Sequence, residues 1–314
     1  MWSINTALAL NSSSDSYKSV WNSRSASLAD GMLAVDGSAD ESVLKLTGAY
    51  TAAQVRAALD LQAADHVFEI GCGVGRIGAQ LAPTLAGWHG LDIADNMAEL
   101  TRDRLAMVPG AKASALTGAA LSPLADASMD KGYCVAVFIH MDKEDFNLYL
   151  REVARVLKPG GLFYFDVWNL AHPVGWQRFS YEVDEIGRSN PSQRKDVARN
   201  QFCTPDEVRL YVKHAGLELA FEHSDSPWVQ VVARKPGGAA APALEQRRAA
   251  IAYSPRWTEL FSDACAVLIG GTHPETMLAR WRTLPADEPE PPMFIAWLSA
   301  IWQRSPHQWP ATAD

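Results

Sequence analysis

Residues 67–76 read Val-Phe-Glu-Ile-Gly-Cys-Gly-Val-Gly-Arg, an apolar run that leads into three glycines spaced by one residue. The apolar residues His66–Ile70 predict a short buried strand, and residues 76–82 predict a helix that ends at Pro83. Glycine lets the backbone approach a ligand closely, and the first turn of a helix offers N–H groups without intrahelical partners. This unit of strand, turn and helix therefore predicts a binding site for a small ligand.

The turn alone does not define which ligand is bound. A similar turn holds the pyrophosphate of dinucleotides in the fingerprint G-x-G-x-x-G, but here Arg76 stands in the place of its last glycine. Asp92 ends the next predicted strand, residues 88–92, about twenty residues further on, where a carboxylate can accept from both ribose hydroxyls. NAD-binding enzymes share that acidic residue, so an NAD-dependent oxidoreductase stays open as an alternative at this point.

Strands and helices are predicted to alternate through the middle of the chain. Helices are expected to begin at Thr51 and to cover residues 96–107 and 144–157, and further strands are expected at residues 113–116, 133–139 and 162–167. This alternation predicts a doubly wound α/β fold, in which a mostly parallel sheet is covered by helices on both faces. Thr204-Pro205 predicts a late helix that ends near Gly216, and a closing antiparallel pair is expected at residues 217–222 and 228–234.

Three parts are expected along the chain. Residues 1–49 form a partly helical N-terminal segment, residues 50–235 form the α/β domain, and residues 168–203 are an insertion after its fifth strand. The run KPGGAAAP at 235–242 predicts a linker to a helical extension, residues 243–314, which carries five of the eleven tryptophans.

Composition limits the classes of function. The chain of 314 residues has a net charge of −8 and a pI of about 5.5, so nucleic acid is not expected as a partner. The four cysteines are far apart in the sequence, and no spacing predicts a metal site. Lys18 follows the short N-terminal apolar run instead of preceding it, and no apolar run reaches the length of a membrane helix. A cytoplasmic protein that is not embedded in a membrane is expected.

Four motifs in order carry a resemblance to a known family. The run at 69–76 resembles the first motif of class I (Rossmann-like) S-adenosylmethionine-dependent methyltransferases, and Gly90-Leu91-Asp92-Ile93 with the following Asp95-Asn96-Met97 resembles the second. Residues 124–130 resemble the stretch before the family's fourth strand, and residues 155–161, RVLKPGG, resemble the turn before its fifth. The resemblance implies a seven-stranded sheet and S-adenosylmethionine as the cofactor.

The resemblance also implies roles for individual residues. Gly71, Cys72 and Gly73 would pass under the methionine part of the cofactor, and Glu69 would contact the same part. Asp92 would bind the ribose. The adenine would be bound by the side chains of Ile93 and Met97 and, because alanines stand where the family often has an acidic residue, by backbone groups of Ala119 or Ala120.

Each of these assignments has a structural alternative. Glu69 could be a structural cap, and Met97 could belong to the core. The thiol of Cys72 is interpreted as a small filler, because no basic neighbour in the sequence would lower its pKa.

The acceptor side is expected at the ends of the fourth and fifth strands, where ligands of doubly wound folds collect. His140 is the candidate general base, since its ordinary pKa is close to neutrality, although it could instead brace the next helix. Asp166 and Trp168 are candidate acceptor contacts, and His172 and Tyr181 in the insertion are further candidates.

The expected activity is transfer of a methyl group to oxygen, nitrogen or sulfur of a small molecule. The alternatives are a non-catalytic S-adenosylmethionine-binding protein and a methyltransferase that acts on a macromolecule. The tryptophans of the extension are expected to pack an added helical layer, with an aromatic box for a cation as the alternative, and such a layer could mediate a homodimer.

Overall fold

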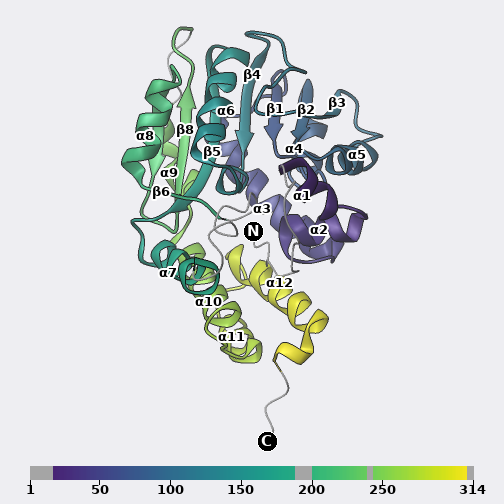
Figure 1. Cartoon of the computed structure of the whole chain (residues 1–314), viewed down its shortest axis with the longest axis vertical. Helices are drawn as coiled ribbons and strands as arrows, with labels where there is room; N and C mark the ends of the chain where they lie inside the picture. Colours follow the sequence, from purple (N-terminus) through teal and green to yellow (C-terminus); the bar gives the residue numbers. More distant parts are fainter. Residues whose placement is uncertain (1–16, 188–199, 239–242, 310–314) are drawn as a thin grey trace, which may run out of the picture.

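A mixed sheet of eight strands organises the residues that the computed structural model describes, which are 17–187, 200–238 and 243–309 (Figure 1). Its main path has the order β3-β2-β1-β4-β5-β8-β7, and β6 pairs with β5 beside this path. The strands are β1 (His66–Ile70), β2 (Gly87–Asp92), β3 (Ala111–Ala115), β4 (Met129–Cys134), β5 (Leu157–Asn169), β6 (Phe202–Cys203), β7 (Glu218–His223) and β8 (Trp228–Arg234).

The direction of the strands confirms the doubly wound, mostly parallel prediction. Strands β1 to β5 run parallel to one another, whereas β8 runs antiparallel to β5 and to β7. Seven strands lie on the main path, as expected, and the two-residue β6 adds an eighth where the insertion returns to the sheet.

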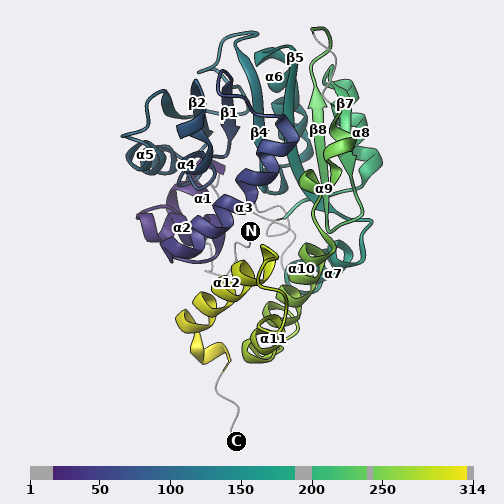
Figure 2. The same cartoon turned by 180° about the vertical axis from the view of Figure 1, so that it is seen from behind.

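Helices cover both faces of this sheet. Helices α6 (Lys143–Val156) and α8 (Pro205–His214) lie over the face seen in Figure 1, and α3 (Glu41–Leu59) and α9 (Arg248–Ile251) lie over the opposite face seen in Figure 2. Helix α5 (Asp95–Arg104) packs on β2 and β3, and the short α4 (Gly78–Leu81) follows the glycine turn. The strands are buried from both sides, which explains their nearly continuous apolar sequences.

Several boundaries differ from the sequence-based expectation, such as the start of β5 at Leu157 instead of residue 162, and two of the differences have a visible cause. The strand expected at residues 133–139 is β4, which ends at Cys134, because Ala136 adopts a positive φ of 56° that no strand accommodates. The helix expected from Thr51 begins at Glu41, where the Asp40 carboxylate accepts from the Ser42 N–H at 2.7 Å and caps the first turn. The expected start of the late helix is confirmed, with Thr204 as its cap.

The remaining helices lie beyond the end of the sheet to which β5 leads (Figure 1). They are α7 (Pro173–Tyr181), which is followed by a π-helical turn at Glu182–Gly187, and α10 (Pro255–Leu268), α11 (Pro274–Trp281) and α12 (Glu290–Arg304) of the C-terminal extension. Helices α1 (Tyr17–Ser23) and α2 (Leu28–Asp36) cover the glycine turn at the N-terminal side. No helix within the described ranges combines the length and the apolar character that crossing a membrane requires.

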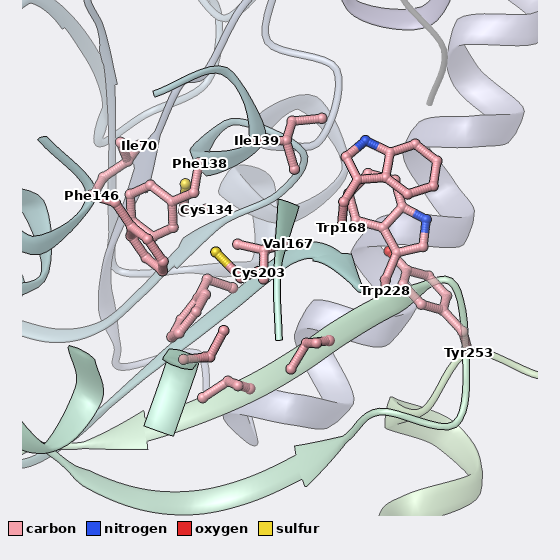
Figure 3. Packing of buried hydrophobic residues seen from close by; sticks show 14 of the residues in the cluster. Ile70, Cys134, Phe138, Ile139, Phe146, Val167, Trp168, Cys203, Trp228 and Tyr253 are labelled. Carbon is pink, nitrogen blue, oxygen red and sulfur yellow. The ribbon is translucent and has the colours of Figure 1, made fainter. Parts of the chain in front are cut away.

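Aromatic side chains join the extension to the sheet. Trp168 of β5 stacks on Trp228 of β8 with ring centres 4.5 Å apart (Figure 3). The Phe261 ring of α10 meets both indoles edge-on. The tail residues Trp281 and Trp297 are at most 1% exposed. These contacts support the interpretation of the tail tryptophans as the packing of an added helical layer.

Candidate functional site

The glycine turn after β1, residues 71–75, has no space for a side chain at Gly71 and Gly73. Gly71, Gly73 and Gly75 have φ angles of 72°, 54° and 77°, in the left-handed region that favours glycine. A Cβ on Gly71 would lie 2.3 Å from Val137 Cγ2, and one on Gly73 would lie 2.7 Å from Val35 Cγ1. The turn therefore needs glycine both for its backbone conformation and for its close neighbours.

The turn is held from behind by α5 and β2. The Thr101 hydroxyl donates to the Gly73 carbonyl at 2.6 Å, and the Arg104 Nε donates to the Val74 carbonyl at 2.7 Å. The N–H groups of Gly71 and Cys72 both donate to the carbonyl of Leu91 on β2. These bonds fix the turn at the carboxyl edge of the sheet.

A pocket opens in front of this turn, with an empty volume, its open mouth included, of about 1150 Å³. The ends of β1 and β2, the segment 116–119, the loop that follows β4, and helices α1 and α2 line it. Its place at the carboxyl ends of parallel strands is where doubly wound folds bind small ligands. The structure brings nine of the sequence-predicted residues to its wall: Glu69, Gly71, Cys72, Gly73, Asp92, Ile93, Met97, Ala119 and His140.

Asp92 lies at the end of β2 with its carboxylate fixed by backbone donors. Oδ2 accepts from the Gly73 N–H and Oδ1 accepts from the Ala94 N–H, both at 2.9 Å. Burial raises the pKa of Asp92 to about 6, although these backbone donors oppose the rise. Each oxygen has a second lone pair, so the group can accept two further hydrogen bonds from a ligand in the pocket.

Glu69 lies beside the turn at the end of β1. Its Oε2 accepts from the Tyr133 hydroxyl at 2.7 Å, and the same hydroxyl oxygen accepts from Trp88 Nε1 at 2.9 Å. Burial raises the pKa of Glu69 to about 8, while the Tyr133 hydroxyl and the positive charge of Arg76 lower it. Glu69 is therefore both anchored in the sheet and part of the pocket wall.

The apolar end of the pocket lies between β2 and α5. Ile93 and Met97 contribute to its wall together with Leu116 and Ala119. Met97 is 1% exposed and also packs in the cluster of α2, where Met32 and Val74 are neighbours, so it serves the core and the pocket together. Ala120 does not line this pocket, so its predicted backbone contact with an adenine stays untested.

His140 ends the short 3-10 helix Phe138–His140 that follows β4. Its ring meets the Trp21 ring of α1 edge-on, with ring centres 5.0 Å apart. Both residues line the pocket, so an ionisable ring lies on its wall.

The N-terminal helices contribute residues that the sequence analysis did not assign to the site. Tyr17, Trp21, Ala34 and Val35 line the pocket from α1 and α2. The Tyr17 hydroxyl accepts from the Asp142 N–H at 2.7 Å. The many serines around these residues give no sign that the segment lines a pocket. The apolar and aromatic residues between 17 and 35 are the feature of the sequence that indicates packed helices here.

The four predicted acceptor contacts lie elsewhere and do not line the pocket. The Asp166 carboxylate is 1% exposed and accepts from the Ala136 N–H and the Tyr253 hydroxyl. Trp168 is buried against Trp228, as described above. The His172 ring caps α7 by accepting from the Val174 N–H, and the Tyr181 ring packs with the Arg178 guanidinium. The structure thus gives each of them a structural contact, and a role at the acceptor stays a prediction.

The described ranges contain neither a cysteine pair nor a metal-binding cluster. The four cysteines are buried and unpaired as thiols, and burial raises the pKa of the Cys72 thiol well above its ordinary value. No group of three or more His, Cys, Asp or Glu side chains in the described part of the chain is arranged to hold a metal ion.

Comparison with known proteins agrees with the geometry. Residues 68–165 match the family model described as a methyltransferase domain. Methyltransferase GfsG of Streptomyces halstedii is 38% identical over 106 residues, which cover 33% of this chain and 37% of that protein. The 27-O-demethylrifamycin SV methyltransferase of Amycolatopsis mediterranei is 29% identical over 164 residues, which cover 51% of this chain and 56% of that protein.

Among solved structures, a SAM-dependent methyltransferase of Methanosarcina mazei has a TM-score of 0.46 at 20% identity and covers 57% of this chain and 95% of its own. The matches to the two curated relatives span between about a third and just over half of their length. Residues 68–165 thus match a methyltransferase domain, and the strand order and the glycine turn are in line with a class I S-adenosylmethionine-dependent methyltransferase fold.

Proposed function

We propose that the pocket binds S-adenosylmethionine and that the chain transfers its methyl group to an oxygen atom of a small-molecule acceptor. The observation that carries the proposal is the joint presence of Glu69, the glycine turn and Asp92 on one pocket wall. The printed name of the Amycolatopsis relative, which denotes an O-demethyl substrate, supports oxygen as the accepting atom. Nitrogen and sulfur acceptors and macromolecular acceptors are the alternatives.

The residues present fit this cofactor. The turn at Gly71 and Gly73 leaves no room for a Cβ, which suits a backbone that a ligand approaches closely. The Asp92 carboxylate, held by two N–H donors, can accept from two ribose hydroxyls, and the apolar wall at Ile93 and Met97 suits an adenine ring. The Glu69 carboxyl group can accept a hydrogen bond from a positively charged amino acid moiety, and it supplies negative charge once it loses its proton, above its raised pKa.

When bound, S-adenosylmethionine supplies a methyl group on a positively charged sulfur, which is a strong electrophile. The chain contributes orientation and the exclusion of water, with α1 and α2 closing the pocket on one side. His140 would accept the acceptor's hydroxyl proton on a ring nitrogen as the oxygen attacks. An acidic hydroxyl or a thiol would need this base less than an unactivated alcohol.

The proposal is tested by incubating the full chain with methyl-labelled S-adenosylmethionine and a fractionated cell extract. Label in a small-molecule fraction, absent with the Asp92→Ala variant, supports the proposal and yields the acceptor. Label in protein or nucleic acid contradicts a small-molecule acceptor, and binding without transfer in any fraction favours a non-catalytic cofactor-binding protein.

The homodimer and the cytoplasmic location also stay proposals. Light scattering of the purified chain checks the first, and fractionation of the source cells checks the second.

A further inference from the structure

The loop that follows β4 forms one wall of the pocket and holds a strained backbone. Val135, Ala136 and Val137 all line the pocket, and Ala136 has a φ of 56°, which is unfavourable for a residue with a Cβ. Val137 packs against the glycine turn, close to Gly71, and its carbonyl accepts from the His140 N–H at 2.9 Å. The position of Ala136 therefore affects both the turn and the candidate base.

A buried carboxylate holds Ala136 in this conformation. Asp166 Oδ1 accepts from the Ala136 N–H at 2.6 Å, and Oδ2 accepts from the Tyr253 hydroxyl at 2.8 Å. Asp166 lies on β5, the neighbour of β4 in the sheet. Strained backbone persists only where its surroundings determine it, and these two hydrogen bonds are the visible determinant here.

Two further contacts hold Tyr253 in place, one through its backbone and one through its ring. Its N–H donates to Gln230 Oε1 of β8 at 2.6 Å, and its ring stacks on Trp257 of α10 with centres 4.7 Å apart and planes 7° apart. Trp257 stacks in turn on Tyr50 of α3, whose hydroxyl donates to Glu290 Oε1 of α12. The stack of Tyr50, Trp257 and Tyr253 thus fixes the position from which the Tyr253 hydroxyl donates to Asp166.

We propose that Tyr253 is a positioning residue for the pocket: its hydroxyl orients Asp166, which holds Ala136 and so fixes the wall at 135–137. Tyr253 lies well outside residues 68–165, so the C-terminal extension takes part in forming the site. The consequence for ligand binding rests on the proposed function, whereas the effect on the wall does not.

The charge state of Asp166 gives this contact a pH dependence. Burial raises the pKa of Asp166 to about 6, and the Ala136 N–H and the Tyr253 hydroxyl lower it. The other titratable groups around it are Tyr164 of β5, the Cys134 thiol of β4 and the more distant Arg76 guanidinium. Removing the Tyr253 hydroxyl raises this pKa further, so the carboxylate loses its charge at a higher pH and accepts less strongly from Ala136.

Hydrogen exchange of the full chain, without any ligand, tests the effect on the wall. Tyr253→Phe keeps the stacked ring and deletes the hydroxyl, and Tyr50→Phe, which deletes a hydroxyl from the same stack without touching Asp166, is the matched control. We expect the peptide that spans residues 134–141 to exchange at least about fivefold faster in Tyr253→Phe and at the parent rate in Tyr50→Phe. Asp166→Ala, which removes the acceptor of the Ala136 N–H, is the second variant, and its expected acceleration is at least as large.

Titration with S-adenosylhomocysteine between pH 5.5 and 8.5 supplies the second readout. We expect Tyr253→Phe to bind about three- to tenfold more weakly than the parent, with the larger loss just above pH 6, where Asp166 is charged in the parent and still protonated in the variant. We expect Tyr50→Phe to bind like the parent. Unchanged exchange at 134–141 in Tyr253→Phe overturns the proposal, as does equal acceleration in Tyr50→Phe. If the parent fails to bind the probe while the exchange results hold, the proposed function fails and the positioning role stands.

Discussion

The Tyr133 hydroxyl lies 2.7 Å from Glu69 Oε2 and donates to it, which makes a buried tyrosine of β4 the anchor of a carboxylate that lines the pocket from β1. The two residues are register partners in the parallel sheet, and Trp88 of β2 completes the chain by donating to the same hydroxyl. Three adjacent strands thus place one carboxyl group at the edge of the glycine turn.

Glu69→Gln should change how stability depends on pH. The folded-state pKa of Glu69, about 8, lies above its ordinary value of 4.5, so the folded chain retains a proton that the unfolded chain has lost between these values. The free energy of unfolding therefore falls as the pH rises through this window, by at most about 1.4 kcal/mol per pH unit from this group. Urea denaturation at a series of pH values should show that the free energy of unfolding falls less with rising pH in Glu69→Gln than in the parent. At pH 8 the variant should be the more stable of the two.

The exposed Glu245→Gln is the control for that comparison and should follow the parent. If the free energy of unfolding of Glu69→Gln changes with pH between 5 and 8 as it does in the parent, Glu69 does not titrate in that range. The same variant should bind S-adenosylhomocysteine more weakly at pH 8.5, because the ligand's ammonium loses its negative partner.

Asp92→Ala should weaken binding of S-adenosylhomocysteine about 100-fold, which corresponds to about 3 kcal/mol for a buried, charge-assisted pair of hydrogen bonds. The substitution also leaves the Gly73 and Ala94 N–H groups without their carboxylate, so thermal unfolding must be measured beside calorimetric titration. Asp95→Ala, three residues on at the exposed start of α5, should retain the parent affinity. Unchanged affinity in Asp92→Ala would mean that the ribose lies elsewhere.

Gly71→Ala should abolish measurable binding of the same ligand. An alanine there would have an unfavourable φ of 72° and a Cβ 2.3 Å from Val137. Adding Val137→Ala relieves the contact and leaves the backbone strain, so the double variant should recover part of the affinity in the same titration. Full binding by the single variant would show that the turn does not touch the ligand.

His140→Ala should lower kcat for an unactivated hydroxyl acceptor about 100-fold or more, the usual contribution of a general base. The dissociation constant for S-adenosylhomocysteine should stay within about twofold, since a base need not contact the cofactor. Steady-state kinetics with the acceptor obtained from the labelling experiment provides the measurement. A parent-like kcat would instead give His140 the bracing role that its contact with Trp21 offers.

Local pattern was sufficient to predict the parts of the fold that depend on local chemistry. The strand at residues 66–70 is confirmed at its predicted ends, and the helix capped by Thr204 begins where Thr-Pro is the usual start. The end of β4 was missed because the left-handed Ala136 depends on Asp166, which is thirty residues away in the sequence. Helix α3 was predicted ten residues too short because Gly48 and two threonines mask its first turns.

The candidate site divides in the same way. Glu69, the glycines and Asp92 could be found because they lie at fixed offsets from two strand ends, and the pocket brings them together. The wall from α1 and α2 was missed, although apolar and aromatic residues from 17 to 35 hint at helices there. The contact of Asp166 with Tyr253 could not be predicted, because only tertiary packing brings these two segments together. The burial of Asp166 and Trp168 was not predicted either, because residues of the C-terminal extension, Tyr253 and Phe261, cover them.

The most direct measurement of the central claim is calorimetric titration of the full parent chain with S-adenosylhomocysteine and, separately, with NAD. We expect one molecule of S-adenosylhomocysteine to bind per chain and no heat from NAD, with the first signal strongly reduced in Asp92→Ala. Binding of NAD in place of S-adenosylhomocysteine, or binding of S-adenosylhomocysteine that ignores Asp92, would contradict the assignment of this pocket.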